Sequence, residues 1–382
     1  MVASDHLRDA RVVVVGVGAI GSTLAYRLAQ AGARVTTIER AHAAAGTTGA
    51  TFAWLNGLDK PPRAYHRLNM LGIRDQEDLA DELGGDWVHV TGSLHWTERA
   101  DGARAAGMAR GMRQLIEWGA RVDRLTPEQV TRDLEPDVQI DPAAVDAVWL
   151  VERAGWLDPV ALAHGAMSAA VARYGAELIH GEVAGMRRDG DGIAAVVLAD
   201  GTEIGADVVV NAAGPDASGV SALAGAVLQV ERTPGILIVT APAPVRLGRV
   251  AFAGDVNLRP DGGSRLMVQR EPLDTDVIDG TAIPLGDPRI AAAMELARHV
   301  VPGLAGVEAE GIRLGVRAMP KDGYPIVGFD PAVFNLYHVI THSGITLAAR
   351  LALLVTEELT GGDTAPLEPY RPGRFASAAP AG

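Results

Sequence analysis

The N-terminal part of the chain combines a short apolar run, a helical spacing and a second apolar run. Residues 11–15 form a continuous β-branched run, which predicts a buried strand. Apolar residues then recur at helical spacing through residues 22–31, and the Gly32 that follows is typical of a helix end. A second strand is predicted at residues 34–39. The pattern therefore predicts a strand–helix–strand unit.

The rest of the chain carries both helical and strand-like patterns. Helices are predicted at residues 62–83, 102–119, 159–175, 288–301 and 344–359. Strands are predicted within residues 87–97, near residues 145–151, 179 and 183, at residues 193–198, 207–211 and 335–340, and repeatedly between residues 226 and 270. Residues 126–141 are predicted to be a turn-rich stretch.

A glycine motif, Gly16-Val-Gly-Ala-Ile-Gly21, joins the first strand to the first helix. Gly16 allows the sharp exit from the strand, Gly18 lets a pyrophosphate approach the backbone, and Gly21 lets the helix pack closely on the strand. Free N–H groups and the dipole at the helix N-terminus favour the negative phosphates. Because the motif lies between a strand and a helix, it predicts a dinucleotide site.

Glu39, at the end of the second strand, is the acidic partner of this motif. Its carboxylate can accept hydrogen bonds from both hydroxyls of an adenosine ribose and would repel a 2′-phosphate, which disfavours NADP. Residues 46–50 (GTTGA) are a candidate second phosphate loop for a larger cofactor such as FAD. Taken alone, this loop leaves an ordinary turn equally open.

Elements typical of a nucleotide-binding domain occur at the start, in the middle and at the end of the chain, with strand-rich stretches between them. We therefore expect an α/β fold in which a discontinuous Rossmann-like domain is interleaved with an α+β substrate-binding domain built on an antiparallel sheet. The expected cofactor domain comprises residues 1–87, 150–217 and 312–375. The expected substrate-binding domain comprises residues 88–149 and 218–311, and residues 376–382 are expected to be a disordered tail.

Charge and composition exclude several classes of function. The net charge is −13 and no run of basic residues interrupts it, which disfavours nucleic-acid binding, including RNA modification. The apolar helix candidates are too charged to span a membrane, and a cytoplasmic location is expected. The chain has no cysteine, so disulfides, zinc–thiolate sites and a cysteinyl flavin link are excluded. No metal site is predicted, and the oligomeric state is left open.

Two further segments carry a resemblance to a known family. Residues 208–215 (VVVNAAGP) and 317–328 (RAMPKDGYPIVG), taken with Glu39-Arg40 and the loop 46–50, resemble the glycine oxidase / D-amino-acid oxidase family of flavoproteins. That family also includes sarcosine oxidases and D-amino-acid dehydrogenases. The resemblance runs from about residue 10 to residue 360 and is specific at these segments and at the C-terminal helix. It implies FAD bound noncovalently in an extended form.

The resemblance also implies a set of residues that surround the cofactor. They are Gly16, Gly18, Ala19, Ile20 and Gly21 for the pyrophosphate, Glu39 for the ribose, Arg40, Thr47 and Thr48 for the phosphates and ribityl chain, Val183 for the adenine, Ala213 and Gly214 beside the cofactor, and Ser343, Gly344, Ile345 and Thr346 for the flavin pyrimidine end.

Three residues are candidates for the catalytic side of the site. Arg317 matches a substrate-carboxylate arginine of amino-acid-oxidising members, since a planar guanidinium binds a carboxylate through two parallel hydrogen bonds; bracing of the cofactor domain is the alternative. Lys60 would favour oxygen activation as a cation near the flavin, or be a solvated surface residue. His342 follows Thr341 where family members often have Gly-His, which leaves a ligand contact, a place beside the flavin ring and a structural role open.

The sequence thus predicts FAD-dependent oxidation of an amino acid or a related small primary or secondary amine. Hydride transfer to flavin N5 would give an imine that hydrolyses, and oxygen or another electron acceptor would take the electrons. One alternative is a flavin-dependent 2-hydroxy-acid dehydrogenase, which needs a positioned base for the alcohol proton. A second alternative is a non-catalytic flavin-binding protein.

Overall fold

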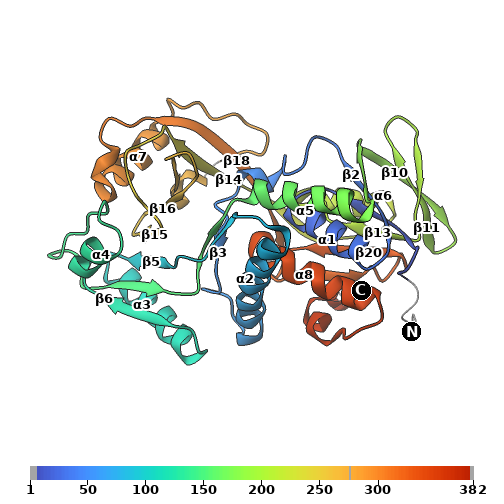
Figure 1. The fold of residues 1–382 in the computed structure, drawn as a ribbon, viewed down its shortest axis with the longest axis horizontal. Helices are drawn as coiled ribbons and strands as arrows, with labels where there is room; N and C mark the ends of the chain where they lie inside the picture. Colours follow the sequence, from blue (N-terminus) through green and yellow to red (C-terminus); the bar gives the residue numbers. More distant parts are fainter. Residues whose placement is uncertain (1–6, 275–276, 379–382) are drawn as a thin grey trace.

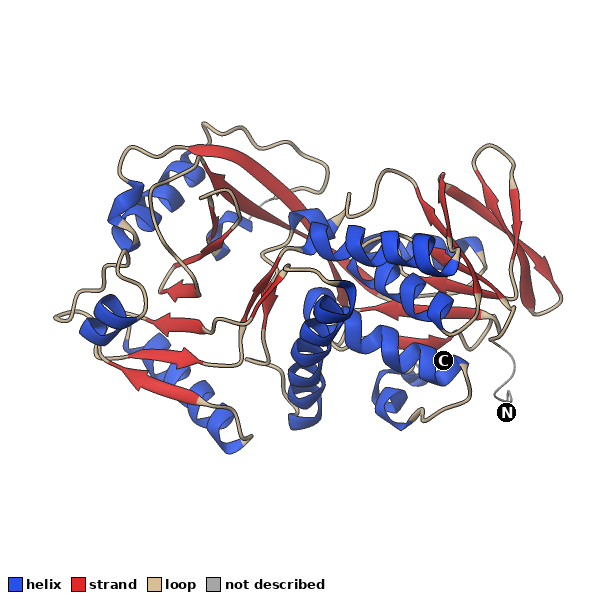
Figure 2. Ribbon diagram, viewed as in Figure 1, coloured by secondary structure: helices blue, strands red, loops and turns tan. Residues whose placement is uncertain are grey.

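The computed structural model describes residues 7–274 and 277–378. A helix-covered sheet and a second, larger sheet lie next to each other along the long axis of the molecule (Figures 1 and 2). The first sheet has six strands in the spatial order β19 (Ile326–Phe329), β20 (Leu336–Ile340), β13 (Val208–Asn211), β1 (Arg11–Val15), β2 (Arg34–Glu39) and β9 (Glu177–His180). Neighbouring strands run parallel, except for β19 beside β20.

Both faces of the six-stranded sheet are covered. The helices on one face are α1 (Ala19–Gln30), α5 (Pro159–Tyr174) and α8 (Gly344–Leu359), with α2 (Arg63–Leu83) packed on α8. A three-stranded antiparallel sheet of β10 (Val183–Asp189), β11 (Gly192–Leu198) and β12 (Glu203–Gly205) covers the other face, with α6 (Ala217–Leu223) beside it.

The central strand β1 explains why its sequence is continuously apolar. Val12 and Val14 belong to the core shared with the helices, whereas Val13 and Val15 belong to the core shared with the three-stranded sheet. Successive side chains of a strand point to opposite faces, so a strand buried on both faces needs apolar residues at every position. The predicted strand–helix–strand unit is confirmed.

The larger sheet has eight strands. Their spatial order is β18 (Ala309–Pro320), β14 (Val230–Thr240), β17 (Leu266–Gln269), β16 (Val256–Pro260), β15 (Val250–Ala253), β5 (Ser93–Trp96), β7 (Val148–Val151) and β6 (Val122–Leu125). All neighbours are antiparallel except β15 and β5, which are parallel. Helix α7 (Pro288–Val300) packs on β16 and β17. The predicted α/β class with a second, largely antiparallel sheet is confirmed.

The remaining elements are mostly short. They are the small antiparallel sheet β3 (Trp54–Leu55), β8 (Gly155–Leu157) and β4 (Val88–His89), the helix α3 (Gly102–Glu117), and the 3₁₀ turns η1 (Thr47–Ala50), η2 (Gly214–Asp216), η3 (Glu271–Asp274), η4 (Pro302–Leu304), η5 (Ala365–Tyr370) and η6 (Pro372–Ala378). The division into a cofactor domain and a substrate-binding domain stays a prediction. Of the predicted tail, residues 379–382 lie outside the described residues, and residues 376–378 end η6.

The prediction for residues 126–141 was incomplete, because this stretch contains the helix α4 (Pro127–Asp133). Thr126 Oγ1 accepts a hydrogen bond from Gln129 N at 3.2 Å, and Gln129 Oε1 accepts one from Thr126 N at 2.8 Å. This reciprocal capping box, with a proline in the first turn, is a helix-start signal that was present in the sequence.

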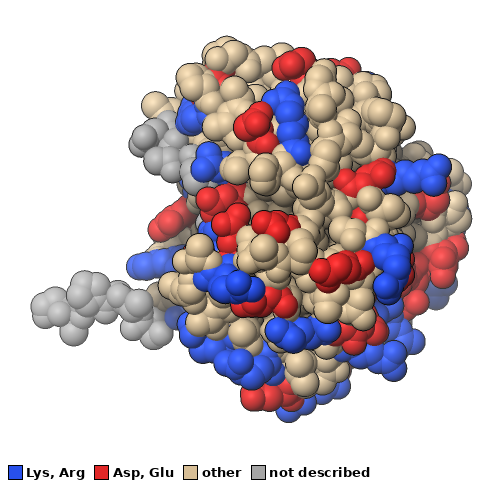
Figure 3. All heavy atoms as spheres, turned by 90° about the vertical axis from the view of Figure 1, so that its left-hand side faces the viewer, with Lys and Arg blue, Asp and Glu red and all other residues tan. Residues whose placement is uncertain are grey.

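The distribution of surface charge and the length of the helices bear on which partners the protein can bind. On the face drawn in Figure 3, positive and negative side chains are interspersed. None of the helices in the described part of the chain has the length and apolar character required to cross a bilayer.

Candidate active site

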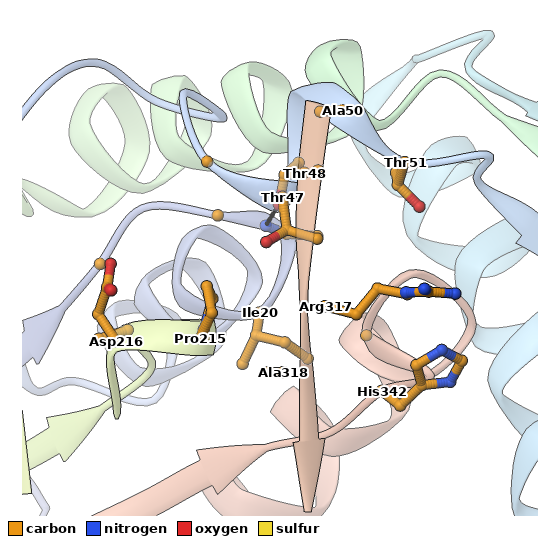
Figure 4. A pocket seen from close by; sticks show the side chains of 18 of the residues that line it. Ile20, Thr47, Thr48, Ala50, Thr51, Pro215, Asp216, Arg317, Ala318 and His342 are labelled. Atoms are coloured by element: carbon orange, nitrogen blue, oxygen red, sulfur yellow. Dashed lines mark hydrogen bonds between the residues drawn. The ribbon is translucent and has the colours of Figure 1, made fainter. Parts of the chain in front are cut away.

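A cavity of about 1070 Å³ lies where the six-stranded sheet, the loop after β2 and the eight-stranded sheet meet (Figure 4). Every predicted site residue except Gly21 lines it. The structure therefore brings together segments from the start, the middle and the end of the chain. The individual roles of these residues stay predictions.

The glycine turn is shaped by close backbone packing. Gly16 has φ +96°, and a Cβ there would lie 2.8 Å from the Ala212 carbonyl oxygen of the neighbouring chain segment. A Cβ on Gly21 would lie 1.9 Å from the Gly16 carbonyl oxygen, so Gly21 permits the contact between α1 and β1 from behind the cavity. A side chain at Gly21 would push the helix away from the strand, and one at Gly16 would collide with the backbone of Ala212.

The loop 46–50 docks on the start of α1. Thr48 Oγ1 accepts a hydrogen bond from Ala19 N at 3.0 Å, and a Cβ on Gly18 would lie 2.9 Å from the same oxygen. Ile20 N is in the first turn, where helix geometry leaves N–H groups without intrahelical partners. The loop and the helix start thus form one wall that suits a pyrophosphate.

The same loop contacts the strand that carries Arg317. Thr47 Oγ1 donates a short hydrogen bond to the Val316 carbonyl oxygen. A Cβ on Gly315 would lie 2.2 Å from the Ala50 carbonyl oxygen, so β18 passes directly against η1. The predicted phosphate loop and the strand of the predicted substrate arginine are therefore held together by a side-chain hydrogen bond and a close backbone contact.

Glu39 is fixed by backbone N–H groups at the edge of the cavity. Its Oε2 accepts from Val17 N at 2.9 Å and its Oε1 from Ala41 N at 3.0 Å. Carboxylate oxygens have further lone pairs, which leaves capacity for ribose hydroxyls. Arg40 donates to Asp216 at 2.7 Å, so the predicted phosphate contact of Arg40 depends on its remaining N–H groups.

The N-terminus of α8 faces the same cavity as that of α1. Ser343, Gly344, Ile345 and Thr346 line it, and a Cβ on Gly344 would lie 3.9 Å from Ile20 Cγ1. Ser343 Oγ is 3.0 Å from Tyr65 Oη, which fixes the start of the helix. Two helix dipoles thus direct their positive ends toward one cavity and favour negative charge in it.

Arg317 and His342 lie on one side of β18 in Figure 4, whereas Pro215 and Asp216 lie on the other. His342 lines the cavity. Burial among the surrounding residues, together with the nearby Lys60 and Arg317 cations, lowers the pKa of His342 to about 4. Burial also lowers the pKa of Lys60. Lys60 is thus a partly buried residue of the cavity wall and does not lie on open surface.

Arg317 is already engaged by the protein. Its Nε donates to the Thr233 carbonyl oxygen at 3.4 Å, and its Nη2 donates to the Pro234 carbonyl oxygen at 3.2 Å. The same Nη2 forms an ion pair with Asp274 Oδ2 at 2.9 Å. Among the described residues, Nη1 has no hydrogen-bond partner.

Sequence reasoning missed one wall of the cavity. Leu237, Phe252, Asn257, Gln269 and Asp274 line it from five different elements of the 218–311 stretch. The lining residues are spread over these separate elements, so no single linear motif marks the wall. Pairing of Phe252 with Asn257 and of Asn257 with Gln269 across the sheet brings them together.

Two buried polar atoms of this region support the presence of a bound group. Trp54 Nε1 and Asn56 Oδ1, both from residues on the cavity wall, have no partner in the part of the chain that the structure describes. Buried polar groups are normally hydrogen-bonded, so a ligand or water has to supply these bonds. The same described residues hold no cluster of histidines and carboxylates that would bind a metal ion.

Comparison with known proteins shows the family of the chain. The profile of the family described as FAD dependent oxidoreductase matches residues 11–358. The chain is 26% identical over 378 residues to glycine oxidase of Geobacillus kaustophilus. This alignment covers 93% of the present chain and 94% of that protein.

Solved structures extend the comparison to the fold. The crystal structure of glycine oxidase from Geobacillus kaustophilus matches with a TM-score of 0.83 at 24% identity, over 96% of this chain and 99% of that chain. L-proline dehydrogenase from P. horikoshii also matches with a TM-score of 0.83, at 22% identity over 97% of this chain and 98% of that chain. The resemblance found in the sequence is confirmed. The chain belongs to the family of FAD-dependent oxidoreductases, with FAD as its cofactor.

Proposed function

We propose that the chain oxidises an amino acid, or a small amine that carries a carboxylate, with noncovalent FAD in the cavity. The observation that carries this proposal is Arg317, which lines the cavity near Lys60 and His342 and whose Nη1 has no partner among residues 7–274 and 277–378. A guanidinium is the side chain best suited to a carboxylate. Similarity to a protein named glycine oxidase supports the amino-acid class but does not select glycine.

The cavity wall formed by Gly18, Ile20, Thr48 and Glu39 fits the adenosine and pyrophosphate parts of FAD. The start of α8 would face the flavin pyrimidine end. When bound, FAD supplies the hydride acceptor. The chain's own residues bind the substrate, orient it and exclude water from it.

The charges around Arg317 also affect the proton on the substrate amine. Lys60 lines the cavity, and like charge disfavours an ammonium group beside it, whereas the charge of Arg317 is offset by Asp274. His342 adds no positive charge at neutral pH, because its pKa is lowered to about 4. The subsite therefore favours the neutral amine, which is the form from which a hydride leaves.

A 2-hydroxy-acid dehydrogenase is the second candidate, and His342 is the observation that favours it. A neutral histidine on the cavity wall beside Arg317 can accept the proton of an alcohol. Its lowered pKa makes it a weak base, which places this candidate behind amine oxidation.

The test is an anaerobic screen in which the purified yellow protein is mixed with amino acids, N-methyl amino acids and 2-hydroxy acids. Loss of the oxidised flavin absorbance with an amine substrate is expected. Bleaching by hydroxy acids alone would replace the proposal by the second candidate. A flavin that no compound in the screen bleaches would favour a non-catalytic flavin protein.

A further inference from the structure

Asp274 occupies one edge of the Arg317 guanidinium. The guanidinium has five N–H groups, and Nε and Nη2 carry three of them. Those three groups donate to the carbonyl oxygens of Thr233 and Pro234 and to Asp274 Oδ2. A substrate carboxylate therefore reaches Arg317 through Nη1, unless Asp274 leaves.

The position of Asp274 is built into the neighbouring strand. Its Oδ1 accepts a hydrogen bond from Ile236 N at 2.9 Å, so both carboxylate oxygens are engaged. Gly235 makes room for it, because a Cβ at residue 235 would lie 3.0 Å from Oδ2 and 3.2 Å from Oδ1. The Asp274 side chain is only 18% exposed. The Ile236 N–H group and the space left by Gly235 thus hold this carboxylate against Arg317.

The ion pair of Arg317 with Asp274 determines the net charge in this part of the cavity. Asp274 offsets the positive charge of Arg317, and Lys60 is a second cation near His342. The wall contributed by Leu237, Phe252, Asn257 and Gln269 is uncharged. One substrate carboxylate is therefore compensated, whereas a second one would meet neutral side chains and the repulsion of Asp274.

We propose that Asp274 is a specificity residue that restricts the subsite to substrates with a single carboxylate. The inference rests on the proposed function of Arg317 as the carboxylate-binding residue. Its chemical content is that monocarboxylic amino acids or amines are accepted and dicarboxylic ones are discriminated against. Asp274 acts through Arg317 and through its own charge, and it takes no proton in the reaction.

The experiment measures binding of acetate and malonate to the FAD-loaded protein by titration calorimetry at constant ionic strength. The wild type is expected to bind acetate more tightly than malonate. Asp274→Asn keeps an acceptor for Ile236 N but removes the charge, so it should tighten malonate binding by about tenfold and acetate binding by less. Asp274→Glu restores the charge and should return the preference toward that of the wild type.

Glu310→Gln is the matched control. Glu310 forms an exposed ion pair with Arg265 and belongs to β18, the strand that carries Arg317, but it does not line the cavity. Its substitution should leave the ratio of the two affinities unchanged. An equal change in Glu310→Gln and Asp274→Asn would show a general charge effect and overturn the proposal.

The affinities of the wild-type protein for acetate and malonate test the proposal even if the variants fail to fold. Tighter binding of malonate than of acetate by the wild type, or no binding of acetate, overturns the proposal. An unchanged affinity ratio in a folded, yellow Asp274→Asn protein also overturns it. The absence of flavin bleaching by every amino acid would instead overturn the proposed function, and the binding assay distinguishes that failure because it needs no turnover.

Discussion

Replacement of Arg317 by alanine tests the centre of the proposed site. The expected result is a loss of kcat/KM for the best carboxylate substrate, with FAD still bound. A hydrogen bond to a charged group contributes about 1.5–3 kcal/mol. Since about 1.4 kcal/mol corresponds to a factor of ten, the expected loss is roughly 10- to 150-fold.

The structure refines this expectation. The variant also leaves Asp274 without its cation, although Asp274 keeps the bond from Ile236 N. The remaining negative charge repels a substrate carboxylate, so the upper part of the range is expected. Arg317→Lys keeps the charge but cannot reproduce three hydrogen bonds with fixed planar geometry, and it should give an intermediate loss.

The assay combines steady-state kinetics over several substrates with the FAD content of each purified variant. Arg265→Ala is the control, because Arg265 forms an ion pair outside the cavity with Glu310 of β18. It should leave kcat/KM and FAD content near the wild-type values. If Arg317→Ala released FAD together with activity, the arginine would brace the cofactor domain and the carboxylate role would be refuted. An unchanged kcat/KM would refute it equally.

Three further changes probe other parts of the structure. Lys60→Met removes a partly buried cation from the cavity wall and should slow the return of the yellow colour when oxygen is added to the reduced protein; an unchanged rate in stopped-flow absorbance would exclude Lys60 from that step. Gly18→Val places a side chain 2.9 Å from Thr48 Oγ1, and we expect at least tenfold weaker FAD retention in dialysis, against a wild-type-like result if the loop can move aside. Burial lowers the pKa of His95 to about 3, so between pH 6.5 and 3 the unfolded chain binds a proton that the folded chain does not, and folding stability falls as the pH falls. From pH 6.5 to 5 the loss is about 2 kcal/mol, measurable by urea unfolding; His95→Gln should remove that part of the slope, and equal slopes in both proteins would contradict the assignment.

The parts of the site that could be predicted are those formed by residues adjacent in the sequence. The strand, the glycine turn and Glu39 follow from local rules, since backbone geometry and helix dipoles act within one unit of the chain. The helix α4 follows the same kind of rule through Thr126 and Gln129, but its seven residues are too few for apolar positions to recur at helical spacing.

The substrate wall was beyond sequence reasoning for a different reason. Phe252, Asn257 and Gln269 are neighbours only because three strands pair in one register, and pairing register depends on tertiary packing. The ion pair of Asp274 with Arg317 joins residues 43 positions apart and leaves no local pattern. Its placement depends on Gly235, a glycine that no local pattern distinguishes from the others.

The contact of β18 with the loop 46–50 couples the binding of the cofactor to the binding of the substrate carboxylate. Thr47 binds the carbonyl of Val316, and Arg317 is the next residue along the strand. A dinucleotide that rigidifies this loop would therefore also align the guanidinium, so that each ligand assists the other by the same factor. Apoprotein prepared without flavin should then hold small organic acids less tightly than the loaded enzyme does.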